Sequence, residues 1–352
     1  MKIAVLTSGG DAPGMNAAVR SVVLGGQSRG HAVVGVRRGY EGLLAGEIQD
    51  FPVGSTDGIT GLGGTILGSA RCKSFPTPAG QEQARARLRE LGIDALVVIG
   101  GNGSLTGAHI LAAAGACRVV GLPASIDNDV GHTGLAIGVD TAVNTIVEAC
   151  DRISDTARAH RRAFVVEVMG RRCGFLAMRA GIAAEADAVL YGEKNAAEAE
   201  VIERLRGVLR RCFAPGRGKK RVLIVKAEGV GIPTARLVAA LQAHLDEDMP
   251  GVDVRETVLG HVVRGGHPSA LDRSIGQRLG YGAVLALERG LSDVMMGWDV
   301  PAGVGEATQD PAVRVVSLAE VLAETARLLD GTSPVVATRL ALLAQVEDLL
   351  SM

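Results

Sequence analysis

Residues 95–104 read Ala-Leu-Val-Val-Ile-Gly-Gly-Asn-Gly-Ser, an apolar run that passes directly into glycines. An apolar run without alternation suits a strand that is buried on both faces of a parallel sheet. Glycine after such a strand, followed by a helical pattern, is the order of a strand–turn–helix unit. This stretch therefore predicts an α/β protein built on a parallel sheet.

The same order recurs along the chain. Ile3–Leu6 leads into a glycine turn and a helix over about 14–24, and Val119–Leu122 leads into the turn 123–129. Further strands are expected over 33–36, from 164, over 222–225 and from 258, and helices over 81–91, 139–154 and 334–350. A length of 352 residues suggests roughly two domains. We therefore expect two doubly wound, Rossmann-like domains with mainly parallel sheets.

Composition excludes several classes of protein. The 37 basic and 38 acidic residues nearly cancel, which leaves no global basic field for nucleic acid. No apolar run approaches the roughly 18 residues of a membrane span, so no membrane partner is expected. The start, MKIAVLTSGG, enters a strand-like run with no secretory pattern. The five cysteines lack a CxxC spacing, which favours a reduced, cytoplasmic compartment.

Three glycine turns are expected at the carboxyl ends of strands: 9–10, 63–64 and 100–103. Ligands of open α/β sheets bind there, and glycine lets the backbone and the next helix N-terminus approach a phosphate. No turn matches the Walker A or the dinucleotide fingerprint. A tight left-handed turn explains any one of them. Three together favour a phosphoryl ligand.

Charged side chains follow several of these expected strands. Asp127 and Asp129 lie just past one strand end, where they could supply a general base and a metal-holding acid, or merely an Asx turn or helix cap. Arginines stand beside glycine at 71, 171 and 264, and a guanidinium suits bidentate phosphate binding, although a single arginine is more often a surface charge. Likewise, His261 could be a polar-network histidine.

Together these segments resemble the 6-phosphofructokinase family over most of the chain. The motifs that carry the resemblance are TSGGDAPGMNAA (7–18), GTILGSAR (64–71), SIDND (125–129), VVEVMGR (165–171) and LGHVVRGG (259–266). The resemblance implies transfer of the γ-phosphoryl group of ATP to the 1-hydroxyl of fructose 6-phosphate, with magnesium. It also implies an active site in the cleft between two domains, 1–138 plus 263–313 for the nucleotide and 139–262 plus 314–352 for the sugar phosphate.

The family's functional residues carry over to positions of this sequence. Asp127 matches the base that takes the proton of the sugar hydroxyl, Asp129 an acid of the metal and phosphate region, and Arg171 the arginine that stabilises the transferring phosphoryl group. The nucleotide positions are Gly10, Arg71, Cys72, Gly101, Asn102, Gly103 and Ser104. The sugar-phosphate positions are Ser125, Ile126, Asp127, Arg162, Met169, Gly170, Arg171, Glu228, Arg255, His261 and Arg264. Of these, Arg162 and Arg255 match arginines lent by a neighbouring subunit, which implies a homo-oligomer, usually a tetramer.

Three positions bear on the phosphoryl donor and the metal. Diphosphate-using relatives carry Asp at the position of Gly103 and Lys at that of Ala124, so both residues favour ATP. The family usually has Asp, serving magnesium, where this chain has Asn102. An amide is a weaker ligand for a hard cation than a carboxylate, so we expect magnesium dependence with weaker affinity, the metal being held by Asp129, Asn102, water and substrate phosphates.

The family's bacterial effector site is matched incompletely. Arg20 represents one arginine of a pair that is interrupted at Leu24, and Ser154 stands where another arginine is expected. Lys219 and Lys220 resemble the site's basic pair. Allosteric control by ADP or phosphoenolpyruvate therefore stays open, as do three alternative functions: a diphosphate-dependent enzyme, a non-catalytic metabolite sensor, and a nicotinamide dehydrogenase, which lacks its ribose-binding acid here.

Overall fold

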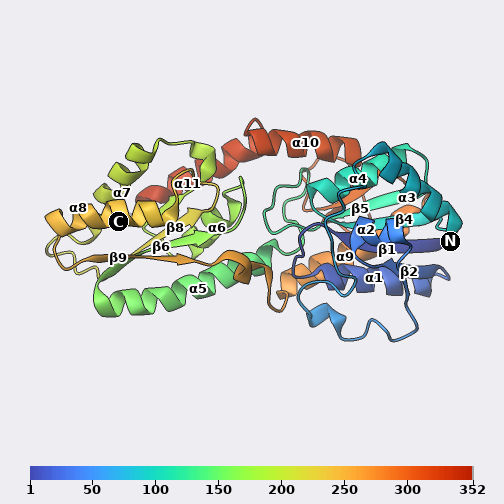
Figure 1. Ribbon diagram of the computed structural model, residues 1–352, viewed down its shortest axis with the longest axis horizontal. Coiled ribbons are helices and arrows are strands. Elements are labelled where there is room, and N and C mark those ends of the chain that lie inside the picture. Colours follow the sequence, from blue (N-terminus) through green and yellow to red (C-terminus); the bar gives the residue numbers. More distant parts are fainter. Residues whose placement is uncertain (351–352) are drawn as a thin grey trace. The chain divides into compact units, whose positions relative to one another are not determined.

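A computed structural model describes residues 1–350, which form two compact units. The first unit contains Met1–Thr141 and Arg264–Asp330, and the second contains Ala142–Val263 and the chain from Gly331 onward. Figure 1 shows that each unit is a sheet with helices packed against it. None of the helices within residues 1–350 combines the length and apolar character needed to cross a bilayer.

The first unit is built on an eight-stranded sheet of order β11-β12-β10-β5-β4-β1-β2-β3. Its strands are β1 (Lys2–Ser8), β2 (Ala32–Val36), β3 (Ile48–Asp50), β4 (Ala95–Gly100), β5 (Arg118–Pro123), β10 (Val294–Trp298), β11 (Glu306–Ala307) and β12 (Val313–Ser317). The five central strands are parallel, whereas β3, β11 and β12 pair antiparallel at the two edges. The predicted parallel sheet is therefore confirmed, with antiparallel additions that the apolar runs did not reveal.

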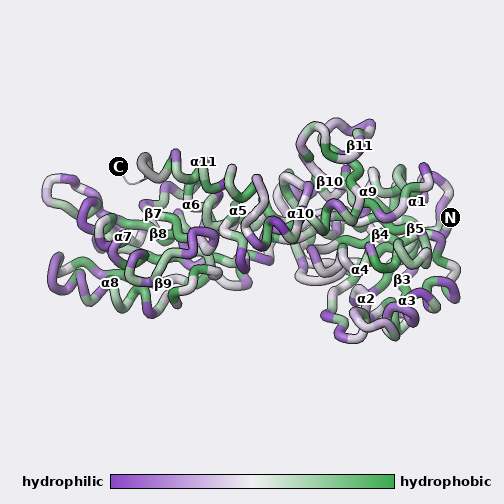
Figure 2. The backbone as a smooth tube through the Cα atoms, turned by 90° about the horizontal axis from the view of Figure 1, so that it is seen from above, coloured by the Kyte–Doolittle hydropathy of each residue, from purple (hydrophilic) through white to green (hydrophobic). Residues whose placement is uncertain are grey.

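Helices flank this sheet. They are α1 (Met15–Ser28), α2 (Gly39–Ala45), α3 (Pro78–Glu90), α4 (Asn102–Ala113), α9 (Ala270–Glu288) and α10 (Leu318–Asp330), with a 3₁₀ turn η1 (Ile59–Gly61). Helices α1 and α9 pack closely together, and α10 packs on α4. Figure 2 shows β4 and β5 as hydrophobic segments of the backbone, in agreement with the full burial of Leu96, Val97 and Val98.

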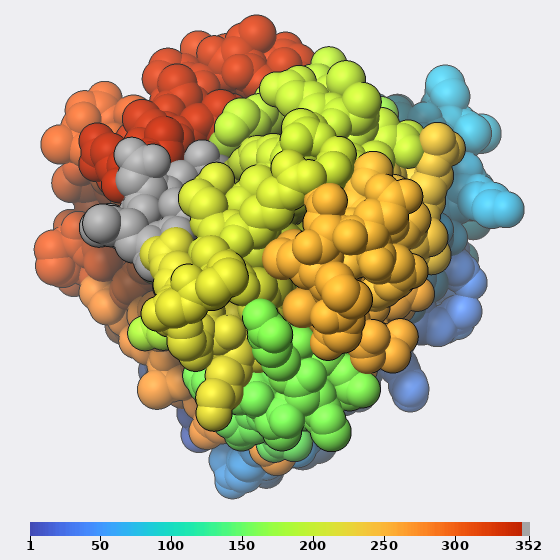
Figure 3. All heavy atoms as spheres, turned by 90° about the vertical axis from the view of Figure 1, so that its left-hand side faces the viewer, coloured from blue at the N-terminus to red at the C-terminus, as the bar shows by residue number. Residues whose placement is uncertain are grey.

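The second unit has a fully parallel four-stranded sheet of order β7-β8-β6-β9. Its strands are β6 (Arg162–Val168), β7 (Ala188–Leu190), β8 (Arg221–Ala227) and β9 (Asp253–Val258). Its helices are α5 (Val139–His160, which begins in the first unit), α6 (Phe175–Ala183), α7 (Glu198–Cys212), α8 (Thr234–Asp248) and α11 (Pro334–Leu350), with 3₁₀ turns η2 (Gly192–Lys194) and η3 (Gly260–Arg264). Figure 3 faces this unit, with the yellow segment that includes α7 at its surface.

The predicted division of the chain is wrong for residues 314–330. We expected them in the sugar-phosphate domain, but they belong to the first unit. The reason is that β12 pairs antiparallel with β10, and that Leu318 and Val321 of α10 lie in the hydrophobic core of the first unit. The chain therefore passes into the second unit at Gly331.

Three local expectations also need correction. Gly63 and Gly64 follow the turn η1 rather than a strand. The strand expected from Val258 instead ends there, so His261 and Arg264 lie in η3. Strands were expected from 164 and from 258, but β6 begins earlier, at Arg162, and β9 begins at Asp253, so that Arg255 lies within it. The apolar pair Val262 and Val263 suggested that the strand continues past Val258. In the structure Val262 is exposed and Val263 is buried, which does not fit a strand buried on both faces.

Candidate active site

The neighbouring strands β1, β4 and β5 of the first unit end at paired residues. Ser8 of β1 pairs with Gly100 of β4, and Gly100 pairs with Pro123 of β5. The turns that follow these strands, 9–11, 101–104 and 124–129, therefore lie at one edge of the sheet. The amide of Ala124 donates to the carbonyl of Gly100 at 3.0 Å, which ties two of the turns together. The structure thus brings together most of the residues predicted to bind nucleotide.

Space is tight at Gly10 and at Gly100, the last residue of β4, but open at Gly103. A Cβ on Gly10 would stand 2.8 Å from Nη1 of Arg264, which also donates to the carbonyl of Asp11 at 3.3 Å. A Cβ on Gly100 would stand 2.6 Å from Oγ of Ser104. At Gly103, in contrast, nothing lies within 4 Å of the added atom. Open space at the start of α4 is where a ligand could approach the helix N-terminus.

The turn after β5 is buried and internally hydrogen-bonded. Ser125 Oγ donates to Oδ1 of Asp129 at 3.0 Å and accepts from the amide of Asp127 at 3.3 Å. Asn128 has a left-handed φ of 52°, and its side chain bonds the backbone of Gly134 and Ala136. Asp127 is 3% exposed and Asp129 8%. Both carboxylates are therefore buried, and the Ser125 hydroxyl holds that of Asp129, whereas Ile126 is fully buried and offers a ligand no surface.

A buried asparagine that the sequence did not reveal holds the loop leading to Arg71 and Cys72. Asn16 of α1 donates to the carbonyls of Leu62 and Gly63 and accepts from the amide of Ile66 at 2.8 Å. Ser69 Oγ bonds the carbonyl of Gly9, so the loop lies beside the first glycine turn. Arg71 is exposed, whereas Cys72 packs partly against the core. No spacing could have identified Asn16, because its partners lie about fifty residues away.

The second unit has its own cluster of loops at strand ends. The carboxylate of Glu228, directly after β8, accepts from the amides of Gly170 at 3.1 Å and Arg171 at 2.6 Å. Arg171 has a left-handed φ of 52°, which a side chain adopts only when its surroundings hold it there. Met169, Gly170, Arg171 and Glu228 are therefore brought together as predicted.

Two predicted residues lie at the other end of the same sheet. Arg162 begins β6, whereas Met169 follows its last residue, so the strand separates them by roughly 20 Å. Arg255 pairs with Phe164, also in the first half of β6. Both arginines bond Asp253, at 3.3 Å and 3.0 Å. Within one chain, Arg162 and Arg255 are thus separated from the loop of Arg171.

A buried lysine is a second feature that sequence reasoning missed. Lys226 of β8 is 1% exposed and forms an ion pair with Glu167 of β6 at 2.9 Å. Thr234, at the start of α8, donates to the same carboxylate. Burial alone would raise the pKa of Glu167, but the hydrogen bonds from Thr234 and Lys226 outweigh it and hold the pKa below its usual value. The network ties the ends of β6 and β8 to α8, next to the loops just described.

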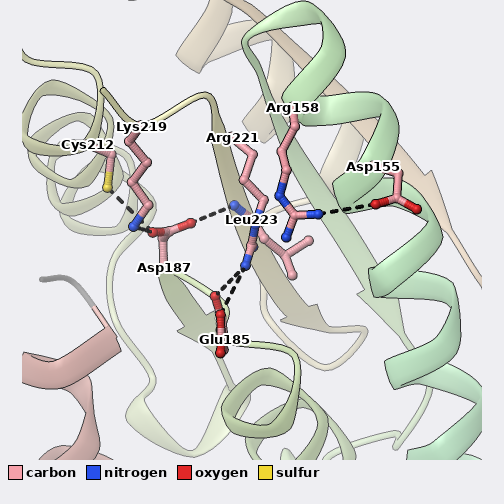
Figure 4. Close-up of polar contacts among 8 residues, drawn as sticks. All are labelled: Asp155, Arg158, Glu185, Asp187, Cys212, Lys219, Arg221 and Leu223. Atoms are coloured by element: carbon pink, nitrogen blue, oxygen red, sulfur yellow. Dashed lines mark hydrogen bonds and ion pairs between the residues drawn. The ribbon is translucent and has the colours of Figure 1, made fainter. Parts of the chain in front are cut away.

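Of the residues that resemble an effector site, Lys219 is already paired within the chain. Lys219 bonds the buried carboxylate of Asp187, which also accepts from the amide of Leu223 at 2.8 Å (Figure 4). Arg221 contacts Glu185 in the same region. Ser154 is 3% exposed, so it offers an incoming anion little surface. Lys220 is exposed.

Metal ligands are sparse around these turns. Among residues 1–350, no group of three or more His, Cys, Asp or Glu side chains is arranged to hold a metal ion. Magnesium differs from metals that need such a cage, because it is commonly held by one or two carboxylates together with water and substrate phosphates. Asp129 and the amide of Asn102, at the start of α4, fit that requirement.

Comparison with known proteins identifies the family of the chain. Residues 2–287 match the profile of the family described as phosphofructokinase. The ATP-dependent 6-phosphofructokinase of Thermotoga neapolitana is 48% identical over 295 residues, which are 84% of this chain and 89% of that protein. The protein of the same name from Natranaerobius thermophilus is 47% identical over 296 residues, with the same coverage.

Solved structures give the same result. Phosphofructokinase from Pichia pastoris superposes with a TM-score of 0.86 at 34% identity; the match covers 98% of this chain but 39% of that much longer one. A pyrophosphate-dependent phosphofructokinase from Marinobacter aquaeolei, 22% identical with a TM-score of 0.75 over 91% of this chain and 84% of that one, shares the fold. With its family profile, its close relatives and its fold in agreement, the chain belongs to the phosphofructokinase family.

Proposed function

We propose that this protein is an ATP-dependent 6-phosphofructokinase, which transfers the γ-phosphoryl group of ATP to the 1-hydroxyl of fructose 6-phosphate. The observation that best supports the proposal is that β1, β4 and β5 of the first unit end at the same edge of the sheet. It places the buried pair Asp127 and Asp129 beside the open N-terminus of α4. A phosphate-accepting helix end next to a carboxylate base is what phosphoryl transfer to a hydroxyl requires.

Each group then has a role in a balanced step. Asp127 takes the proton of the sugar hydroxyl, and the hydroxyl oxygen forms a bond to the γ-phosphorus. The bond from that phosphorus to the β–γ bridging oxygen breaks, and ADP leaves with the electron pair. Arg171, whose backbone amide donates to the carboxylate of Glu228, stabilises the charge on the transferring group through its guanidinium.

The remaining site residues fall into two groups. Backbone and side chains around Gly10, Arg71, Cys72, Gly101 and Ser104 serve the nucleotide. Ser125, Met169, Gly170, His261 and Arg264 serve the sugar phosphate, the last through a guanidinium already placed against Gly10. Magnesium would be held by Asp129 and Asn102 with the phosphates of ATP, and it would neutralise charge on them.

The open space at Gly103 supports ATP rather than diphosphate as the donor. An aspartate there would extend into a region that is empty of protein atoms. Ala124 is 1% exposed, in a backbone bridge to Ile137, so a lysine could be placed there only with rearrangement. Both residues favour a site that accommodates a nucleotide.

The placement of Arg162 and Arg255 supports a homo-oligomer with shared sites, a tetramer in the family's usual form. Because they stand at the opposite end of β6 and β9 from Arg171, they can serve a sugar phosphate only in another copy. We also expect a cytoplasmic enzyme, where its two substrates occur. Since Lys219 is already paired with Asp187, a flat response to ADP and phosphoenolpyruvate is the expected effector behaviour.

A coupled assay with fructose 6-phosphate and magnesium, run with ATP and with diphosphate in parallel, tests this function. Turnover with ATP and none with diphosphate is expected. Turnover with diphosphate alone would favour the diphosphate-dependent alternative. Binding of these substrates without turnover would favour the non-catalytic metabolite sensor.

A further inference from the structure

We propose that Arg339, on the C-terminal helix α11, is a positioning residue for the loop that carries Arg171. Helix α11 spans Pro334–Leu350, beyond the 2–287 segment that matches the family profile. It packs against α6 and β7 of the second unit. The inference rests on the proposed function, because it concerns the arginine that stabilises the transferring phosphoryl group.

Arg339 lies on the buried face of its helix. Val336, three residues before it, is 7% exposed, and Leu343, four residues after it, is 1% exposed. Residues at these spacings share one face of a helix. The neighbouring Thr338 is exposed, and its hydroxyl donates back into α11, to the carbonyl of Pro334. The packing of α11 therefore directs Arg339, and not Thr338, toward α6.

The guanidinium of Arg339 makes two contacts just beyond Arg171. Its Nη1 lies 3.5 Å from the sulfur of Cys173. Its Cζ lies 4.6 Å from the centre of the Phe175 ring, within the range of a cation–π contact. Phe175 is the first residue of α6, so both contacts fall on the segment that joins the Arg171 loop to its next helix.

That segment is coupled closely to Arg171. The amide of Cys173 donates to the carbonyl of Gly170 at 2.9 Å, which closes the turn around Arg171. Gly170 has φ 138°, and a Cβ there would stand 2.5 Å from the carbonyl oxygen of Cys173. On the other side, the carboxylate of Glu228 holds the amides of Gly170 and Arg171. A shift of Cys173 therefore displaces the backbone of Arg171 directly.

Glu228 and Arg339 thus hold the two ends of one turn. Glu228 fixes the entrance through backbone amides, and Arg339 fixes the exit through Cys173 and Phe175. Arg339 acts through the loop and touches no substrate in this scheme. Its removal would loosen Arg171 while leaving the nucleotide turns of the first unit intact.

The test compares Arg339→Ala and Arg339→Gln with the matched control Thr338→Ala. In steady-state assays we expect both Arg339 variants to lose about 10- to 100-fold in kcat, the scale of a small misplacement of a catalytic group. KM for ATP should change less than about twofold. Thr338→Ala should behave as wild type. Equal losses in all three variants would overturn the proposal, since they would point to general damage to α11.

A second arm separates positioning from a structural role. In an Arg171→Ala background, Arg339→Gln should cost less than about a further twofold, because the group it positions is already gone. The same fold-loss in both backgrounds would overturn the proposal.

A third arm does not depend on the reaction. Hydrogen exchange at the amides of 170–173 should be at least about tenfold faster in Arg339→Gln than in Thr338→Ala. Unchanged exchange would contradict the proposal even if the wild-type protein proved to have another activity. If exchange is faster in Arg339→Gln but the wild-type protein shows no kinase turnover, the contact of Arg339 with the loop is supported and only the kinase assignment is refuted.

Discussion

The guanidinium of Arg264 lies beside Gly10, so close that a Cβ on this glycine would stand 2.8 Å from Nη1 of Arg264. The first prediction follows from this contact. Gly10 does not have a positive φ, so Gly10→Ala should fold normally. The new methyl group must displace the guanidinium of Arg264. Because this weakens the charge-assisted hydrogen bond proposed between Arg264 and the sugar phosphate, KM for fructose 6-phosphate should rise about 10-fold.

The matched control for Gly10→Ala is Gly207→Ala. Gly207 lies in α7, and its added Cβ would meet Arg211 Nη1 at an ordinary 3.5 Å. That variant should keep the KM of wild type. An unchanged KM in Gly10→Ala would mean that Arg264 does not serve the sugar phosphate.

Gly103→Asp tests the room for the nucleotide. Because nothing lies within 4 Å of the added Cβ and the backbone is not left-handed, the melting temperature should be nearly unchanged. A carboxylate in the proposed phosphate site should repel ATP and raise its KM by at least about 10-fold. Ala113→Asp, exposed in the last turn of the same helix, adds the same charge away from the site. Equal KM values for the two variants would argue against a phosphate at the start of α4.

Asn102→Asp tests the metal assignment. A carboxylate is a stronger ligand for magnesium than an amide, and a negative charge in the first turn of α4 is also favourable. The magnesium concentration giving half-maximal rate should therefore fall several-fold at fixed ATP. Asn102→Ala should shift it the other way. If the aspartate leaves the magnesium requirement unaltered, residue 102 does not contact the metal.

Lys226→Met tests the buried ion pair with Glu167. The pKa of Glu167 is lowered in the folded protein, so its contribution to stability is present above the unfolded pKa and is lost as pH falls through the folded pKa. Without Lys226, burial would raise that pKa, and the loss should begin at higher pH. We expect about 1–3 kcal/mol less stability at pH 7 and an acid-unfolding midpoint shifted upward.

Exposed Lys220 provides the comparison for this experiment. Lys220→Met removes the same charge from the surface and should leave the acid midpoint in place. Identical midpoints for the two variants would show that the Lys226–Glu167 pair does not govern acid stability.

Much of the site could be predicted because its parts follow strands. Parallel strands end at a common edge, so Gly10, Gly103 and Asp127 lie near that edge as soon as β1, β4 and β5 are recognised as neighbours. Where no strand precedes the motif, as at Gly63, or where the strand ends early, as before His261, the same reasoning failed.

Contacts between distant segments were beyond reach from the sequence. Lys226 reads as an isolated polar residue in an apolar run, and only its pairing with Glu167, 59 positions away, explains its burial. Arg339 meets Cys173 across 166 positions, through the packing of α11. Neither pair leaves a periodic signal, so such networks appear only once the sheet register and the helix packing are known.

Asp127, as the base that accepts the proton of the sugar hydroxyl, is the residue on which the proposed reaction depends most. Asp127→Asn keeps the size of this 3% exposed side chain but removes its ability to take a proton. The decisive measurement is kcat of this variant with ATP and fructose 6-phosphate, with ATP affinity measured separately. A fall of about 10²- to 10⁴-fold at unchanged ATP affinity is predicted. Turnover close to that of wild type would contradict the account.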